Sequence, residues 1–292
     1  MKKKINYIKL CLIIVFTMFM TSCVQVKINE FENSNILTTS YPLMFITDTL
    51  YGDHAKVKSI YPNETNPNNL TFNSKQLDNF ATNNLYIYLG QDKEQSKIAL
   101  ELKNKNPNIL LIDAGVGINT STRQELLLNP SNILMIAKNI QNGLEEYINN
   151  TYISKNIEKN LNDLNVKISE IDAELRLTYT NAKYKTLVVT SNSLNFLEKY
   201  GFKIVSLDKL TRTNDDINYV KTLVKNELVS YVYSLENIED DEVITNLIRT
   251  TGVKKLTLRT LDTITDEEEK VKKNYYQIMN ENIELIKKET YK

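Results

Sequence analysis

Few residues of this 292-residue chain carry the functional groups that catalysis needs. Its single histidine, His54, follows Gly52 and Asp53 at a predicted turn, so we interpret it as a surface residue. A hydrolase needs a nucleophile paired with a base, and the chain has no Gly-x-Ser-x-Gly motif. It also has no phosphate-binding loop, and Gly115 and Gly117 are not completed to a dinucleotide fingerprint. The residues therefore predict that the protein is not an enzyme.

Both cysteines belong to the amino-terminal segment. Lysines open the chain, an apolar run covers residues 10–20, and small residues lead to Cys23. This order predicts a signal peptide at residues 1–22 and resembles a bacterial lipobox, whose cysteine becomes the lipidated first residue of the mature protein. The alternative is an uncleaved anchor with an incidental cysteine, but the apolar run is short for a membrane span. We expect Cys23 to hold the protein at the extracytoplasmic face of the bacterial membrane, with residues 23–35 as a tether. Cleavage also removes Cys11, so no thiol remains for a disulfide or a metal.

The charge of the chain gives no sign of a nucleic-acid partner. Basic and acidic side chains both number 36, and loss of the signal peptide leaves four more acids than bases. We find no basic stripe with interleaved aromatic residues, which is the usual footprint of nucleic-acid binding. We therefore expect no nucleic-acid partner. The predicted partner remains the membrane, through the lipid on Cys23.

A long helix is the strongest structural signal. Residues 152–184 contain neither Gly nor Pro, and apolar residues recur every three or four positions. This spacing predicts one apolar helix face, and at 1.5 Å per residue the helix is roughly 40 Å long. A coiled-coil dimer seam fits the same spacing. Because strands and helices alternate on both sides, we favour one linking helix over residues 149–184. The apolar positions are Ile153, Ile157, Leu161, Leu164, Ile168, Ile171 and Leu175.

Short apolar strands alternate with helices on both sides of this helix, about four in residues 36–148 and about four in residues 185–292. Such strands favour parallel sheets covered on both faces. The sequence therefore predicts an α/β fold of two lobes, each a roughly four-stranded parallel sheet flanked by helices, with a cleft between the lobes. Ligands of open α/β sheets bind at the carboxyl ends of the strands. The loops at those ends are residues 61–69, 113–129, 191–193 and 259–261.

The carboxyl end of the chain is predicted to be one helix. Thr265 to Glu268 form a capping box with acids in the first turn, and Lys287 and Lys288 suit the helix end. We interpret the acid run at residues 266–269 as capping residues, and a cation site is the alternative.

Short motifs along the chain carry a family resemblance through their order and spacing. They are Thr38-Thr39-Ser40-Tyr41-Pro42, Gly52-Asp53, residues 62–70, Leu85-Tyr86-Ile87-Tyr88-Leu89-Gly90, Leu128-Asn129-Pro130, Tyr200-Gly201 and Gly252-Val253. With these motifs the chain resembles the zinc- and manganese-binding lipoproteins of metal ABC importers, some of which are also described as adhesins. The resemblance covers nearly all of the predicted mature chain. It implies a solute-binding protein that presents its ligand to an ABC permease, with two lobes joined by one long helix.

The resemblance also implies a metal site between the lobes, usually of three histidines and one carboxylate, which suits zinc or manganese. With one histidine in the chain, a three-histidine site cannot exist here. Arg259 would place a fixed positive charge beside the metal, and Glu125 remains the one candidate ligand. Zinc or manganese is thus implied by the family and disfavoured by the residues present. The residues at the family's metal positions are Asn68, Glu125, Thr190 or Ser191, and Arg259.

Three interpretations of these positions stay open. Glu125 and Arg259 could form a charge-assisted pair that bridges the lobes in place of a metal. Alternatively, these two residues and Asn68 contact another polar ligand, or the cleft has drifted and binds nothing. The sequence predicts a lipid-anchored solute-binding protein that is degenerate at its metal site. The alternative is a surface interaction or adhesion protein that uses the same scaffold without transport.

Overall fold

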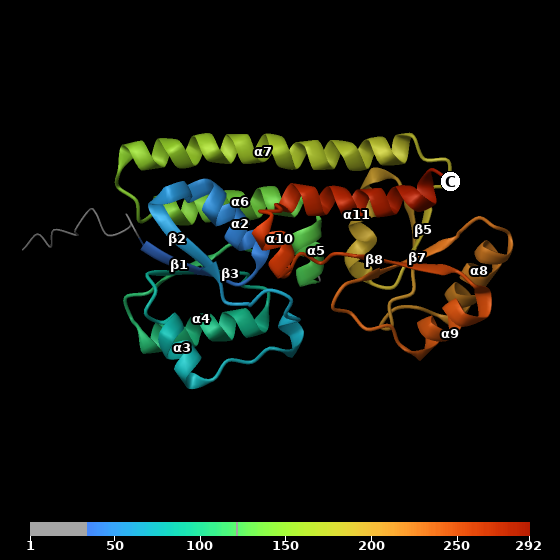
Figure 1. Ribbon diagram of the computed structural model, residues 1–292, viewed down its shortest axis with the longest axis horizontal. Coiled ribbons are helices and arrows are strands. Elements are labelled where there is room, and N and C mark those ends of the chain that lie inside the picture. Colours follow the sequence, from blue (N-terminus) through green and yellow to red (C-terminus); the bar gives the residue numbers. More distant parts are fainter. Residues whose placement is uncertain (1–33, 121) are drawn as a thin grey trace, which may run out of the picture. The chain divides into compact units, whose positions relative to one another are not determined.

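The computed structural model describes residues 34–120 and 122–292 (Figure 1). The predicted signal peptide, Cys23 and most of the predicted tether lie outside these residues. Strand β1 (Ser34–Thr38) begins within the last two residues of the predicted tether. In the described part of the chain, no helix combines the length and the apolar character that crossing a membrane requires.

Four parallel strands form the sheet of the N-terminal lobe, in the order β2-β1-β3-β4. Successive strand residues point to opposite faces of a sheet. Ile36 and Ile87 therefore pack with α2, α6 and α7 on one face, while Leu37 and Tyr86 pack with α3 and α4 on the other. The elements after β1 are α2 (Tyr41–Tyr51), η1 (Gly52–His54), β2 (Ala55–Ser59), η2 (Pro67–Asn69), α3 (Ser74–Phe80), β3 (Leu85–Tyr88), α4 (Lys93–Lys105), β4 (Leu110–Asp113), α5 (Arg123–Leu128) and α6 (Pro130–Glu145).

The C-terminal lobe repeats this plan with a parallel sheet in the order β6-β5-β7-β8. Val188 and Val232 pack with α8 and α9 on one face, and Leu187 and Tyr233 pack with α11 on the other. The elements are β5 (Thr186–Val189), η3 (Asn192–Tyr200), β6 (Lys203–Ser206), α8 (Asn214–Lys225), β7 (Tyr231–Leu235), α9 (Glu242–Thr251), β8 (Lys254–Leu258), α10 (Asp266–Lys270) and α11 (Tyr275–Thr290).

The linking helix α7 (Thr151–Thr180) joins the two lobes. All seven apolar residues of the predicted helix face are buried. They pack against α2 and α6 of the first lobe and against α11 of the second, along which α7 runs in Figure 1. Because this face is covered within the chain, it is not available as a dimer seam. The prediction of two four-stranded parallel sheets joined by one long helix is confirmed.

Two segments differ from the prediction. The loop predicted at residues 113–129 contains the short helix α5, which begins after the N-cap Thr122. The predicted final helix is broken into α10 and α11. The break has a local cause, because Asn274 and Gln277 form a second capping box that starts a new helix, and Lys272 adopts a positive φ of 54° just before it.

Candidate functional site

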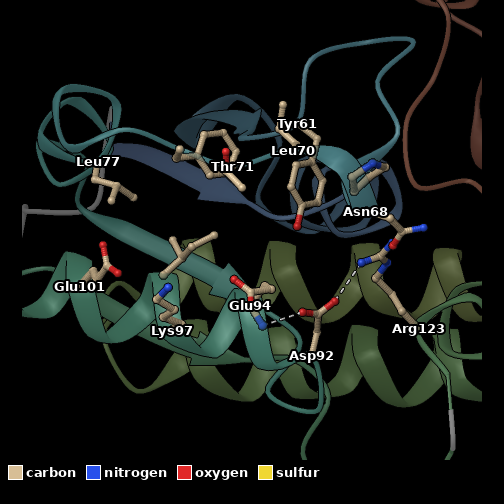
Figure 2. A pocket seen from close by; sticks show the side chains of 13 residues that line it. Tyr61, Asn68, Leu70, Thr71, Leu77, Asp92, Glu94, Lys97, Glu101 and Arg123 are labelled. Atoms are coloured by element: carbon tan, nitrogen blue, oxygen red, sulfur yellow. Dashed lines mark hydrogen bonds and ion pairs between the residues drawn. The ribbon is translucent and has the colours of Figure 1, made fainter.

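An arginine that the sequence analysis passed over lies where the two lobes meet. Arg123 is the first residue of α5. Its Nη1 donates to Asp92 Oδ2 at 2.9 Å, its Nε to Asp262 Oδ1 at 2.9 Å and its Nη2 to Asn68 Oδ1 at 2.8 Å. Figure 2 shows the guanidinium between Asn68 and Asp92. One cation thus holds three polar side chains from three separate segments.

Local structure fixes each partner of Arg123. Asp92 is the N-cap of α4, and its Oδ1 accepts the backbone N–H groups of Glu94 and Gln95 at 3.0 and 3.2 Å. Asn68 lies in the turn η2, directly after Pro67. Asp262 follows β8 and belongs to the C-terminal lobe, and its carbonyl oxygen accepts the backbone N–H of Tyr41 of the N-terminal lobe at 3.0 Å. The Arg123–Asp262 pair therefore connects the lobes.

The pair is shielded from water. The side chain of Asp262 is fully buried, and those of Arg123 and Asp92 are 12% and 13% exposed. Burial raises the pKa of Asp262, and the guanidinium of Arg123 offsets part of this shift. Burial lowers the pKa of Arg123, but Asp262 and Asp92 outweigh it and the net shift is upward. Because two carboxylates face the guanidinium, Arg123 stays a fixed positive charge.

Residues 63–66 make further contacts between the lobes. The Asn63 amide donates to Asp266 Oδ1 at 3.0 Å and to Glu269 Oε2 at 2.7 Å. The backbone N–H of Glu64 donates to the carbonyl of Ile264 at 2.9 Å. Further bonds run from Thr263 Oγ1 to the carbonyl of Thr65 and from the Asn66 amide to the carbonyl of Asn237. The loop that carries Asn68 is thus tied to the C-terminal lobe through residues 63–66.

The structure does not favour the Glu125–Arg259 pair, which was one of three interpretations that the sequence left open. Arg259 lies directly after β8 and binds within its own lobe, with Nε on Glu236 Oε2 at 2.9 Å and Nη1 on Glu268 Oε1 at 2.5 Å. The physical reason is where Arg259 and Glu236 lie in the sheet. Glu236 follows β7, the strand that pairs with β8, so the two side chains leave adjacent strand ends. The carboxylate that reaches the other lobe is Asp262, three residues further along.

The other predicted positions have local structural roles, apart from Asn68, which does contact the centre. Glu125 is half-buried in α5, where its backbone N–H meets the capping hydroxyl of Thr122 at 3.2 Å. The backbone N–H of Thr190 donates to the carbonyl of Tyr233 at 2.9 Å, which extends the β5–β7 pairing. Ser191 is buried and is the N-cap of η3. His54 lies in the turn η1, where its ring and that of Tyr51 form a T-shaped contact.

The described residues do not fit a transition-metal site. Among them, no group of three or more His, Cys, Asp or Glu side chains could hold a metal ion. The oxygens of Asn68, Asp92 and Asp262 that face the junction are already bound to a guanidinium. Zinc prefers nitrogen and sulfur ligands, and none of these three residues supplies one.

A pocket of about 520 Å³ opens beside Arg123 (Figure 2). It lies between the loop at residues 61–73 and helix α4, so it belongs to the N-terminal lobe and not to the predicted cleft between lobes. Its apolar wall holds Tyr61 and Phe72, whose rings stack at 6.3 Å. The other side chains that line it are Pro67, Asn68, Leu70, Thr71, Leu77, Asp92, Glu94, Lys97, Ile98, Glu101 and Arg123.

Comparison with known proteins places this geometry in a family. The chain is 22% identical to the zinc-binding lipoprotein AdcA of Streptococcus pneumoniae over 97% of its own length, and it spans 61% of that relative. It is also 22% identical to the high-affinity zinc uptake system protein ZnuA of Bacillus subtilis, over 88% of this chain and 87% of that protein. The crystal structure of the Zn(II)-bound ZnuA-like domain of S. pneumoniae AdcA shares the fold, with a TM-score of 0.71, 22% identity, and coverage of 89% of this chain and all of that one.

A match to a whole protein family assigns the chain more directly than similarity to single relatives. The family described as "Zinc-uptake complex component A periplasmic" matches residues 36–289, nearly all of the part that the structure describes. That family consists of solute-binding transport components and not of enzymes. The chain therefore belongs to the family of the periplasmic component A of zinc-uptake complexes.

Proposed function

We propose that this protein is the lipid-anchored, extracytoplasmic solute-binding component of an ABC importer, and that its lobe junction no longer holds a transition metal. The family match and the lipobox that ends at Cys23 support the first part. A pneumococcal relative is itself named a lipoprotein. The partner is an ABC permease in the same membrane, to which the protein presents its solute.

Arg123 is the observation that carries the second part. A guanidinium is not deprotonated in proteins, so it is a permanent charge beside Asn68, a position that the resemblance assigns to a metal ligand. A divalent ion about 4 Å from it is repelled by roughly 8 kcal/mol at an effective dielectric constant of 20. No histidine is present to recover that energy, because the one histidine of the chain lies in η1.

The pocket beside Arg123 is the proposed solute site. Within the pocket wall, Asp92 balances the charge of Arg123. The remaining charged residues of the wall are Glu94 and Glu101 against Lys97, so the pocket keeps one surplus negative charge. Acidic side chains beside stacked aromatic rings favour an organic cation with an apolar body. We therefore propose a small organic amine or quaternary ammonium compound as the solute.

Thermal melting of the soluble domain tests the loss of metal binding and the proposed class of solute. We expect no shift of Tm when chelated protein receives Zn²⁺ or Mn²⁺, and a shift with members of a panel of polyamines, aromatic amines and quaternary ammonium compounds. A ligand at a hundred times its Kd adds about 2.7 kcal/mol, or about 5–10 °C for a domain of this size.

Three variants locate the binding site. Glu94→Gln and Glu101→Gln should weaken the response to the cation, and Lys97→Gln should strengthen it. Glu146→Gln is the matched control, because Glu146 is an exposed glutamate at the end of α6 and does not line the pocket. A zinc response that disappears in Asp262→Asn would overturn the loss of metal binding. A domain that responds to nothing favours the adhesion alternative.

A separate labelling experiment tests the proposed lipid anchor at Cys23. Expression in a bacterium with labelled fatty acid should label the wild type and leave Cys23→Ala unlabelled. Release of Cys23→Ala from the membrane fraction is the expected accompanying result. A label on both proteins would contradict the proposed lipobox.

A further inference from the structure

The centre of the lobe junction consists of one cation and three oxygen ligands. Asp262 comes from the C-terminal lobe, whereas Asn68, Asp92 and Arg123 belong to the N-terminal lobe. The three oxygens bind three different nitrogens of one planar group, so they lie around the guanidinium. The arginine thus has the position that a bridging ion would have.

Asp262 depends on Arg123 for its charge balance. Its side chain is fully buried, and in the ranges that the structure describes Arg123 is the cation within ion-pair distance of it. The second carboxylate oxygen, Oδ2, is buried and binds no cation in that part of the chain, and the hydroxyl of Thr260 is the neutral group that lowers the pKa of Asp262. A buried carboxylate with an oxygen that binds no cation, next to a second carboxylate, is a group that attracts a cation strongly.

We propose that Arg123 is a built-in cation that fixes the lobes together, and that removing its guanidinium uncovers a divalent-cation site formed by Asp92, Asp262 and Asn68. Carboxylate and amide oxygens are hard ligands, which match Ca²⁺ and Mn²⁺ better than Zn²⁺. In the natural protein the lobes are therefore closed by a side chain, whether or not a metal ion is available. This inference does not depend on which solute the pocket binds.

Two backbone hydrogen bonds report whether the lobes are closed. The N–H of Tyr41 donates to the carbonyl of Asp262 at 3.0 Å, and the N–H of Glu64 donates to the carbonyl of Ile264 at 2.9 Å. Each joins one lobe to the other, so opening the junction exposes both amides to hydrogen exchange.

The experiment compares wild type with Arg123→Ala, each with EDTA and with 1 mM Ca²⁺ or Mn²⁺ in turn. In wild type we expect both amides to be protected under all conditions and Tm to be unchanged by the ions. In Arg123→Ala with EDTA we expect faster exchange of both amides and a Tm lower by about 6–20 °C. Ca²⁺ or Mn²⁺ should restore at least half of the lost Tm and the protection of both amides.

Two further variants keep the test decisive. Arg123→Ala/Asp262→Asn removes the buried charge together with the arginine, so it should fold without added ions and show no ion response. Arg212→Ala is the matched control, because it also removes a largely buried arginine held by a carboxylate, Asp241, but within one lobe. It should leave the exchange of Tyr41 and Glu64 unchanged.

The proposal is overturned if Arg123→Ala keeps wild-type protection in EDTA and does not respond to the ions. An equal ion response in the double variant would also overturn it, because the ion would then bind elsewhere. If Arg123→Ala fails to fold, the double variant decides: failure to fold there as well refutes the role given to Asp262. A zinc response of the wild type contradicts the proposed function instead, so the two failures are distinguishable.

Discussion

Arg123 and Arg259 have the same chemistry in two different settings. Each guanidinium holds two carboxylates at hydrogen-bond distance. The side chain of Arg123 is 12% exposed, and one partner, Asp262, is fully buried in the opposite lobe. The side chain of Arg259 is 21% exposed, and its partner Glu236 is 31% exposed in the same lobe. One pair connects lobes, and the other organises a loop within a lobe.

The comparison teaches that the cost of losing an arginine depends on what else its partners can bind. Glu268, the second partner of Arg259, also meets Lys273 Nζ at 3.2 Å and accepts the backbone N–H of Thr265 at 2.9 Å. It keeps these bonds when Arg259 is removed. Asp262 has no second cation within ion-pair distance in the described part of the chain, and the hydroxyl of Thr260 is a neutral neighbour. Removal of Arg123 should therefore cost more stability than removal of Arg259, although each guanidinium holds two carboxylates.

The largest expected effect is that of Arg123→Met, which preserves bulk and removes the charge. It should lower the free energy of unfolding at pH 7 by about 3–5 kcal/mol, because Asp262 is left buried and unpaired. Burial already raises the pKa of Asp262, and loss of Arg123 removes the opposing effect. A buried acid with a raised pKa destabilises the fold as pH rises, so the deficit should shrink between pH 7 and pH 5.

Urea denaturation at pH 7 and pH 5 measures the loss of unfolding free energy in Arg123→Met. Arg123→Met/Asp262→Leu serves as the control, and it should regain most of the stability because the buried charge is gone. A deficit that is the same at pH 5 and pH 7 would show that the charge of Asp262 is not its cause.

Arg259→Met is expected to have a smaller effect, about 1–2 kcal/mol at pH 7, since Lys273 and Thr265 still hold Glu268. The measurement is again urea denaturation, in the same buffer as for Arg123→Met. If the two variants lost equal stability, the distinction between the two arginines would have no energetic basis.

The sequence predicted much more of the fold than of the site. Helix α7 was predictable because the apolar period of residues 153–175 is strong and is uninterrupted by Gly or Pro. The two sheets were predictable because short strands that contain apolar residues alternate with helices along the chain. These signals are local, since they depend on periodicity within one segment. The break between α10 and α11 was missed because the capping box at Asn274 lies inside an otherwise helical pattern.

The site depends on contacts between segments far apart in sequence. Arg123 and Asp262 are 139 residues apart, and no local pattern pairs them. Arg259 was chosen because it directly follows the last strand, yet the chain turns across to the other lobe only at Asp262. A partial signal was present, because Asp92 precedes Gln95 at the start of a helix, as an N-cap does. That signal predicts a helix start and says nothing about the arginine that Asp92 binds.

The pH dependence of Glu268 should have the opposite sign to that of Asp262. Burial alone would raise its pKa, but the hydrogen bonds from Arg259 and the backbone of Thr265 lower it to about 2. Ionised Glu268 therefore stabilises the fold above its unfolded-state pKa of 4.5, and this stabilisation is lost as pH falls toward 2. Glu268→Gln should cost about 1 kcal/mol at pH 7, because Gln can keep the hydrogen bond from Thr265 and loses only the charge-assisted part of the bond from Arg259.

Comparing wild type and Glu268→Gln by denaturation at pH 7, 4 and 3 measures this contribution. The difference between the two proteins should narrow as the pH falls. A difference that stayed constant would assign the loss to altered capping of α10 and not to the charge of Glu268.

The smallest expected effect belongs to Asn68→Ala. Asn68 is exposed, and its Oδ1 accepts a bond from Arg123, a cation that keeps both of its carboxylates in the variant. A bond at an exposed position competes with water, so its loss should cost about 0.5 kcal/mol. A double-mutant cycle with Arg123→Met, read by urea denaturation, should give a coupling energy of similar size. If the coupling instead approached that between Arg123 and Asp262, the closure of the lobes would rest on the loop at residues 61–69 as much as on the buried pair. The contrast between Arg123 and Arg259 would then lie in the number of segments each holds, and not in the burial of Asp262.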